Sequence, residues 1–392
     1  MSLFLQLAIL LVIILLAAKL AGYIAIRLGQ PSVLGELLMG IILGPSLLNL
    51  LHLSAFDEKT MTEILRLLGE IGVVFLLFVA GLELHLNELS RNMRISALAG
   101  ILGVLFPFFL GTMAGLLFNF TLEEAVFLGI ILGASSVSIS AQTLMELKQL
   151  KSRVGLSLLG AAVFDDILVI LMLSLFFAFS SHSNTLTGLL LVFGRMLVFF
   201  ALAFVFGLWA LPFIIRKVKS LPVSQNVLTL AIVVLLFYAI SAELIGGMAA
   251  ITGAFIAGLM FARSPEKESL EPRIHALAYG FFVPIFFVNI GLNVNIFAIK
   301  ENLLLGFAVI VAAILGKFLG AGLGGRWAGL SGRESMQLGV GMIPRAEVSL
   351  IAASIGASAG LVNAAESSAI VGMVIICTVI TPPILRYLFH EA

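Results

Sequence analysis

Long runs of apolar residues, separated by short polar stretches, fill the chain from one end to the other. A helix needs roughly 20 mostly apolar residues to cross the hydrocarbon core of a bilayer. The pattern therefore predicts an all-α polytopic membrane protein with about 13 transmembrane helices. The expected spans, numbered 1 to 13, are 3–26, 31–51, 64–84, 95–118, 122–147, 154–180, 187–215, 224–243, 246–262, 273–292, 302–325, 334–358 and 364–388.

Composition excludes most other classes of protein. Hydrophobic residues make up 61% of the chain and charged residues 11%, whereas soluble domains carry about 25% charged residues. The net charge of +1 argues against a nucleic-acid partner. The single cysteine excludes an internal disulfide, and the five histidines are dispersed, so we expect neither a histidine metal centre nor a cofactor. No nucleophile–base constellation is present, so an enzyme is not expected.

Basic residues set the predicted orientation. With the N-terminus outside, fifteen Lys and Arg residues fall in cytoplasmic loops, and only Lys59 and Lys300 fall in outer loops. The positive-inside rule therefore predicts an outer N-terminus and a cytoplasmic C-terminus in a cell inner (plasma) membrane. The first span lacks a basic leader and is too long for a signal peptide. Because all loops are short, we expect no soluble domain.

Two pairs of similar segments indicate an inverted repeat. The Gly-x4-Gly spacing of Gly35 and Gly40 returns at Gly253 and Gly258, which pairs span 2 with span 9. Residues 78–84 resemble residues 287–294, which pairs span 3 with span 10. An offset of seven spans gives the two halves opposite topology, with spans 1–6 and 8–13 as repeats and span 7 as a linker. Such repeats are typical of secondary transporters whose binding site lies near the membrane midplane.

Charged residues in the middle of three spans are the strongest functional candidates. Asp165 and Asp166 lie halfway along span 6, where a carboxylate costs at least about 2.5 kcal/mol to insert. Lys317, near the middle of span 11, is the obvious counter-charge for one of them. A low dielectric favours the protonated carboxyl, so a proton can compete there with a metal cation. Two alternatives remain, an ion pair that serves assembly alone and a lysine that snorkels to the interface.

Spans 5 and 12 are expected to be discontinuous helices that cross beside these charges. Span 12 carries Pro344, Arg345 and Glu347 at mid-membrane depth, among glycines. Span 5 carries a run rich in hydroxyl groups that includes Ser135 and Ser136. Irregular backbone at this depth is tolerated where it lines a cavity or is buried in protein, and hydroxyl and carbonyl oxygens suit an alkali cation. The serines could instead be small residues that permit close helix packing.

With these residues, the chain resembles the monovalent cation–proton antiporter superfamily, and within it the bacterial sodium/proton antiporters of the NapA type. The resemblance implies that Asp166 is the principal carrier of Na⁺ and H⁺, and that Asp165 forms a salt bridge with Lys317 that Na⁺ releases. It implies that Ser135 and Ser136 occupy ligand positions, where the family has Thr-Ser. It also implies that Arg345 and Glu347, which lie near Pro344, are supporting charges that offset the dipoles of the half-helices.

The same resemblance implies further properties of the whole molecule. It gives a core domain of spans 4–6 and 11–13, and a dimer domain of spans 1–3 and 8–10. It also implies a homodimer that moves its core as an elevator, electrogenic exchange from the two acidic residues, and a part in pH homeostasis. A potassium/proton or mixed Na⁺/K⁺ antiporter is the first alternative. A sodium-coupled symporter of an organic anion on a similar scaffold is the second, and the Asp pair opposite Lys317 disfavours it.

Overall fold

The computed structural model of the chain describes residues 1–28, 30–83, 91–180, 185–292, 303–345, 349, 352–353, 356, 361–362 and 364–390. Over these residues the fold is all-helical, without a β-strand. Ten helical stretches are long and apolar enough to cross a membrane. They are Leu3–Arg27, Glu58–Leu82, Met93–Leu117, Leu122–Glu146, Arg153–Leu173, Leu190–Lys219, Asn226–Gly246, Lys267–Leu292, Leu303–Trp327 and Ala369–Phe389.

The remaining expected spans hold shorter helices. Two apolar helices, α2 (Ser32–Leu43) and α12 (Ala250–Phe261), have 12 residues each. Helix α16 (Gly332–Gly341) begins the expected span 334–358, most of which lies outside the described residues. The fold is thus that of a multi-pass helical membrane protein, and the count of thirteen spans stays a prediction.

The chain divides into two compact units. The first comprises 1–66, 92–169 and 287–392, and the second comprises 67–91 and 170–286. Three helices contribute residues to both units, namely α3 (Glu58–Leu82), α8 (Arg153–Ser180) and α14 (Val283–Leu292). The expected division into a core domain and a dimer domain stays a prediction.

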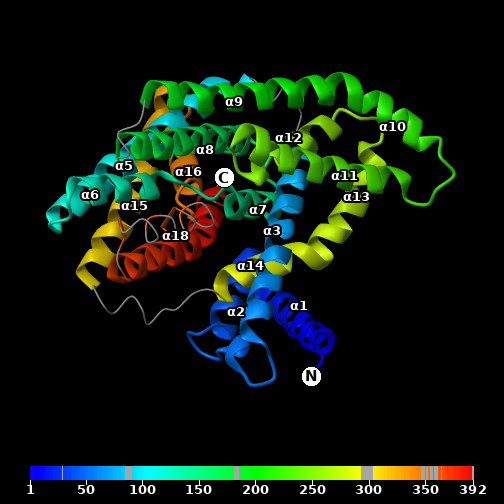
Figure 1. Cartoon of the computed structure of the whole chain (residues 1–392), viewed down its shortest axis with the longest axis horizontal. Coiled ribbons are helices and arrows are strands. Elements are labelled where there is room, and N and C mark those ends of the chain that lie inside the picture. The colour runs from blue at the N-terminus through cyan, green and yellow to red at the C-terminus, as the bar shows by residue number, and fades with distance from the viewer. Residues whose placement is uncertain are drawn as a thin grey trace. The chain divides into compact units, whose positions relative to one another are not determined.

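In the first unit, helix α15 (Leu303–Trp327) packs along α5 (Met93–Leu117), and also contacts α16 and α18 (Ala364–His390) (Figure 1). Three glycines spaced by four residues line the α5 face of α15. A Cβ atom at Gly316 would lie 2.5 Å from Pro107 Cα, and one at Gly320 would overlap the Leu102 carbonyl oxygen. At Gly324, the neighbour is Leu98. The glycine-rich end of α15 is therefore a close helix–helix contact, which holds the neighbouring Lys317 in register.

Two of the helices in the first unit are interrupted. Helix α6 (Leu122–Gly133) and helix α7 (Val137–Glu146) are separated by three non-helical residues, 134–136. Helix α16 ends at Gly341, and 343–345 are also non-helical. Pro344 accounts for this end, because proline has no N–H to donate and disfavours the helical conformation of the residue before it. Helices α6 and α16 both begin with a capping box, at Thr121 and Ser331 respectively.

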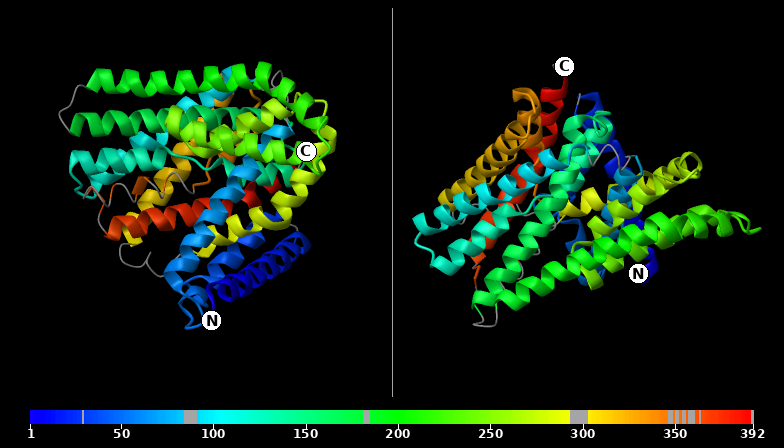
Figure 2. Two further views of the ribbon diagram at one scale, coloured as in Figure 1. Left: turned by 45° about the vertical axis from the view of Figure 1, so that its right-hand side comes forward. Right: turned by 90° about the horizontal axis from the view of Figure 1, so that it is seen from above.

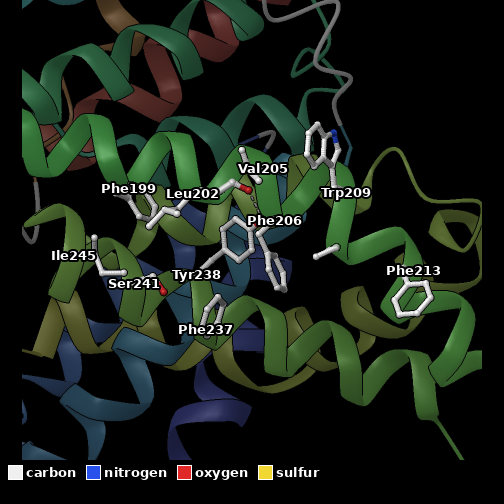
Figure 3. A pocket seen from close by; sticks show the side chains of 12 residues that line it. Phe199, Leu202, Val205, Phe206, Trp209, Phe213, Phe237, Tyr238, Ser241 and Ile245 are labelled. Carbon is white, nitrogen blue, oxygen red and sulfur yellow. Dashed lines mark hydrogen bonds between the residues drawn. The ribbon is translucent and has the colours of Figure 1, made fainter.

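The second unit is built from α9 (Thr185–Val205), α10 (Leu211–Lys219), α11 (Asn226–Ser241), α12 and α13 (Lys267–Leu277), with part of α3 (Figure 2). A π-helical turn, Phe206–Ala210, joins α9 to α10. Tyr238 donates a hydrogen bond to the Ala203 carbonyl across α9 and α11, 2.7 Å. Beside it lies a cavity of about 590 Å³ with an apolar, aromatic lining, which Figure 3 shows between these helices.

Glycines of the repeated motifs form close helix contacts within each unit. In the first unit, a Cβ at Gly40 of α2 would overlap the Val288 carbonyl of α14. In the second, a Cβ at Gly258 of α12 would overlap the Phe78 carbonyl of α3. The span 2 motif thus contacts span 10, and the span 9 motif contacts span 3. A two-fold relation that exchanges span 2 with span 9 and span 3 with span 10 would interchange these two contacts.

Candidate functional site

A buried ion pair lies in the first unit. Lys317 Nζ of α15 is 2.6 Å from Asp165 Oδ1 of α8, and the two side chains are 0% and 1% exposed. Removing both charges from water costs several kcal/mol per ion, which only close contact between them offsets. The charged form of each side chain is therefore stabilised by the charge of the other. Any process that separates Lys317 from Asp165 must therefore supply a substitute charge or move a proton.

Asp166 follows Asp165 on α8 and is only partly buried. Consecutive residues on an α-helix point about 100° apart, so the two carboxylates face different surroundings. Asp166 is close enough for its charge to act on Lys317, as does the charge of Arg345. Two acidic and two basic side chains therefore share this region, and their formal charges cancel.

The two helix interruptions meet beside these charges. The Ser136 amide between α6 and α7 donates to the Pro344 carbonyl after α16, 2.8 Å. The Ser135 hydroxyl donates to the Met342 carbonyl, 3.3 Å, and the Ser140 hydroxyl donates to the Gly341 carbonyl. Each break thus satisfies backbone groups of the other, as buried polar groups require. Ser136 Oγ also lies 2.9 Å from Ser138 Oγ.

Arg345 fixes these breaks to two neighbouring helices. Its side chain is 0% exposed and donates to Ser135 Oγ, 3.2 Å, and to the Ala313 carbonyl of α15, 3.4 Å. Its own carbonyl accepts from Thr378 of α18, 2.6 Å. Within the described part of the chain, the Nε atom has no hydrogen-bond partner. Arg345 therefore brings a permanent positive charge to the breaks, while Glu347, its expected neighbour in function, lies outside the described residues.

The chemistry of this site is that of a small cation and a proton. Carboxylate and hydroxyl oxygens are hard ligands suited to an alkali cation. Because the described charges already cancel, an added cation leaves the region with a net positive charge unless a proton departs. The structure thus brings together five of the expected site residues through the contacts described above, namely Asp165, Lys317, Ser135, Ser136 and Arg345. Asp166 follows Asp165 in the sequence, and its charge acts on Lys317.

Comparison with known proteins assigns the family. The family described as "Sodium/hydrogen exchanger, transmembrane" matches residues 12–389. The chain belongs to the sodium/hydrogen exchanger family. The Na⁺/H⁺–K⁺ antiporter GerN of Bacillus cereus is 41% identical over 377 residues, which cover 96% of this chain and 95% of GerN. The Na⁺/H⁺ antiporter of Enterococcus hirae is 35% identical and covers 96% of each chain.

The fold agrees with that of a solved member. The sodium proton antiporter MjNhaP1 of Methanocaldococcus jannaschii superimposes with a TM-score of 0.66 at 21% identity, covering 98% of this chain and 96% of that one. The expectation of a monovalent cation–proton antiporter family member is therefore confirmed. The roles of individual site residues in this member of the sodium/hydrogen exchanger family stay predictions.

The structure adds a polar contact that the sequence did not indicate. Glu146, at the end of α7, accepts hydrogen bonds from both the amide and the hydroxyl of Ser32, at the start of α2. Gln142 donates to the same carboxylate, 2.8 Å. Glu36 of α2 is 5% exposed, with Lys19 Nζ 3.8 Å away. Glu36 stands out in the sequence as an acidic residue within a span. Nothing in the sequence indicates that Glu146 accepts hydrogen bonds at the N-terminus of α2.

Proposed function

We propose that this protein is a secondary active sodium/proton antiporter in which Na⁺ and H⁺ compete for Asp166 and Asp165. The observation that carries the proposal is the buried, charge-balanced group formed by Asp165 and Lys317 beside Asp166. One carboxylate is occupied by the protein's own cation, and the next is partly exposed. Na⁺ and H⁺ that compete for the same carboxylates cannot bind there together. This competition couples the transport of one ion to the transport of the other.

In the proposed cycle, Asp166 binds Na⁺ once it has released its proton. The added positive charge weakens the hold of Asp165 on Lys317, so Asp165 joins Asp166 as a ligand and Lys317 can release its own proton. Ser135 and Ser136 supply further oxygen ligands at the break. Arg345, with Glu347, offsets the partial charges of the helix ends that meet there. Two carboxylates and one lysine allow more than one proton per Na⁺, so the exchange is electrogenic.

We infer an architecture of 13 spans that supports this cycle. Spans 5 and 12 are the crossed discontinuous helices, and spans 1–6 and 8–13 are inverted repeats. The interchangeable glycine contacts of Gly40 with Val288 and Gly258 with Phe78 support such a repeat. Spans 4–6 and 11–13 form a core that moves as an elevator against a dimer domain, in a homodimer. The N-terminus lies outside and the C-terminus in the cytoplasm of a plasma membrane.

The test uses everted membrane vesicles with an imposed proton gradient. Addition of Na⁺ to vesicles that contain the parent protein should dissipate the gradient, and Asp166→Asn should abolish that response. The matched control is Glu268→Gln, which changes an exposed acidic residue of the second unit. This variant should behave as the parent. A full response from Asp166→Asn at parental expression would refute the assignment of Asp166.

Potassium is a second candidate cargo. The relative GerN carries both Na⁺ and K⁺ in its name and is 41% identical to this chain. Currents on solid-supported membranes, measured with Na⁺, Li⁺ and K⁺ over a range of pH, distinguish the two. A K⁺ response that Na⁺ suppresses competitively indicates one site for both ions. A response to Na⁺ and Li⁺ alone excludes potassium as a cargo.

A further inference from the structure

A second group of ionisable side chains lies within the second unit. Glu83, Glu271 and His275 each offer one ligand atom, and these three atoms lie within 4.8 Å of one another. We propose that they form a binding site for a divalent transition-metal cation of the zinc class. Among the residues that the structure describes, no other group of three His, Cys, Asp or Glu side chains has this geometry.

Helix geometry fixes two of the three ligands. Glu271 and His275 are four residues apart on α13, so their side chains lie on the same helix face one turn apart. Glu83 directly follows α3, and its amide donates to the Val79 carbonyl, 3.0 Å, which keeps it on the last helical turn. A cation held by all three would join the end of α3 to α13.

One ring nitrogen of His275 lacks a hydrogen-bond partner among the described residues, which indicates that a ligand could bind there. His275 Nε2 is buried and has no hydrogen-bond partner among the described residues, although Glu83 Oε1 is 3.4 Å away. The ring packs beside Tyr279, with centroids 5.2 Å apart. A buried nitrogen without a partner costs about 1–3 kcal/mol. A cation between this nitrogen and the two carboxylates would satisfy the lone pair and offset the local excess of negative charge.

Ligand chemistry selects the class of cation. One imidazole nitrogen and two carboxylate oxygens suit Zn²⁺, Co²⁺ or Ni²⁺, whereas Mg²⁺ and Ca²⁺ prefer oxygen ligands alone. Three protein ligands leave a fourth position for water. The side chains of Glu83 and His275 are 20% and 31% exposed, although the ligand atom His275 Nε2 is itself buried. The site is therefore distinct in both ligand set and exposure from the buried Asp165–Lys317 group.

The chain offers a matched control. His52 Nδ1 lies 2.8 Å from Glu58 Oε2, so this pair also joins an imidazole to a carboxylate. The pair is more exposed, with side chains 70% and 56% accessible, and it belongs to no group of three ligands in the described part of the chain. Loss of His52 should therefore leave high-affinity metal binding unchanged.

In the experiment, ZnCl₂ is titrated into the full-length, detergent-purified protein, which carries no polyhistidine tag. Isothermal titration calorimetry measures the heat of binding. We expect one saturable site per chain. His275→Ala and Glu271→Gln should each weaken binding by at least about tenfold, and His52→Ala should match the parent. Elution volume and melting temperature without metal show whether each variant is folded, and Glu271→Gln preserves side-chain shape.

A second measurement reports on the ligands themselves. Co²⁺ bound through an imidazole gives visible absorption bands that His275→Ala should remove and His52→Ala should retain. The proposal is wrong if the parent shows no saturable Zn²⁺ site, or if His275→Ala and Glu271→Gln bind as the parent does. These outcomes do not depend on Na⁺ transport, so they leave the proposed function untouched.

Discussion

The buried Asp165–Lys317 pair and the half-buried Glu83–His275 pair differ in how their charges are compensated. Both place a carboxylate against a basic nitrogen. In the first, the atoms are 2.6 Å apart and the side chains at most 1% exposed. In the second, they are 3.4 Å apart and the side chains are 20% and 31% exposed. The first pair supplies its own counter-charge, whereas the second has a further carboxylate, Glu271, beside it.

The difference follows from burial. A fully buried carboxylate must be neutralised from within, because water cannot reach it. A half-buried one is stabilised by water or by an ion from solution. In the proposed transport cycle, Lys317 is the buried cation that an exchanged Na⁺ displaces from Asp165. An open cluster such as Glu83, Glu271 and His275 suits an ion that binds and stays.

The largest effect expected is from removal of Lys317. Lys317→Ala leaves Asp165 buried without its partner, which should lower the free energy of unfolding by about 3–5 kcal/mol. His275→Ala in metal-free protein should change the free energy of unfolding by less than about 1 kcal/mol, because the nearby Glu83 carboxylate is partly hydrated. Denaturation of both variants in the same detergent, at one pH, measures the contrast.

A double variant sharpens the same comparison. In Lys317→Ala, the buried Asp165 carboxylate has lost its counter-charge. Asp165→Asn combined with Lys317→Ala removes that carboxylate charge, so the double variant should be more stable than Lys317→Ala alone. Equal stability of Lys317→Ala and the parent would show that the ion pair does not stabilise the fold, and would remove the basis for the contrast with His275.

Sequence alone predicted the elements of the site better than their partners. Asp165, Lys317 and Pro344 stand out because charges and proline are costly within apolar spans. The helix breaks follow from Pro344 and from the serine run, both visible in the sequence. The contact of Glu146 with Ser32 was not predictable, because an acidic residue at a span end is ordinary and its partner is 114 residues away. The proximity of Glu83 to His275 was not predictable for the same reason, because these residues are far apart in the sequence.

Glycines show the same limit. The run from Gly320 to Gly325 matches a nucleotide-binding spacing, although a membrane helix gives it no strand–helix context. In the structure, Gly320 and Gly324 lie against α5. Sequence pattern shows that small residues recur on one face of the helix, but only the fold shows which helix they contact.

The next largest effect is expected at this contact, which holds the helix that carries Lys317. Gly320→Ala introduces a Cβ that overlaps the Leu102 carbonyl, and overpacking of this kind costs about 1–3 kcal/mol. The control is Gly194→Ala on α9, where a Cβ meets nothing within 4 Å. Gly194→Ala should leave stability unchanged or raise it by up to about 1 kcal/mol. Melting temperatures that fall equally in both variants would contradict the assigned contact.

A smaller effect is expected from Ser135→Ala. The Arg345 guanidinium loses an acceptor, and its Nε already lacks one, so stability should fall by about 1–2 kcal/mol. Half-saturation for Na⁺ should move to a higher concentration, because a candidate ligand is lost. Currents on solid-supported membranes measure this shift. Ser220→Ala, a serine hydroxyl on an exposed turn, is the control, and an unchanged Na⁺ dependence in Ser135→Ala would remove Ser135 from the site.

The smallest effect tests whether other half-buried carboxylates behave as Glu83 does. Glu146→Gln keeps one acceptor for Ser32 and loses the other, together with a charge at the α2 N-terminus, so stability should fall by about 0.5–1 kcal/mol. Relief of repulsion with the buried Glu36, on which the charge of Glu146 acts, reduces the loss. The control is Glu123→Gln, an exposed acid in the first turn of α6. A loss as large as that of Lys317→Ala would show that partial exposure does not limit the cost, because water would then have failed to compensate the broken contact.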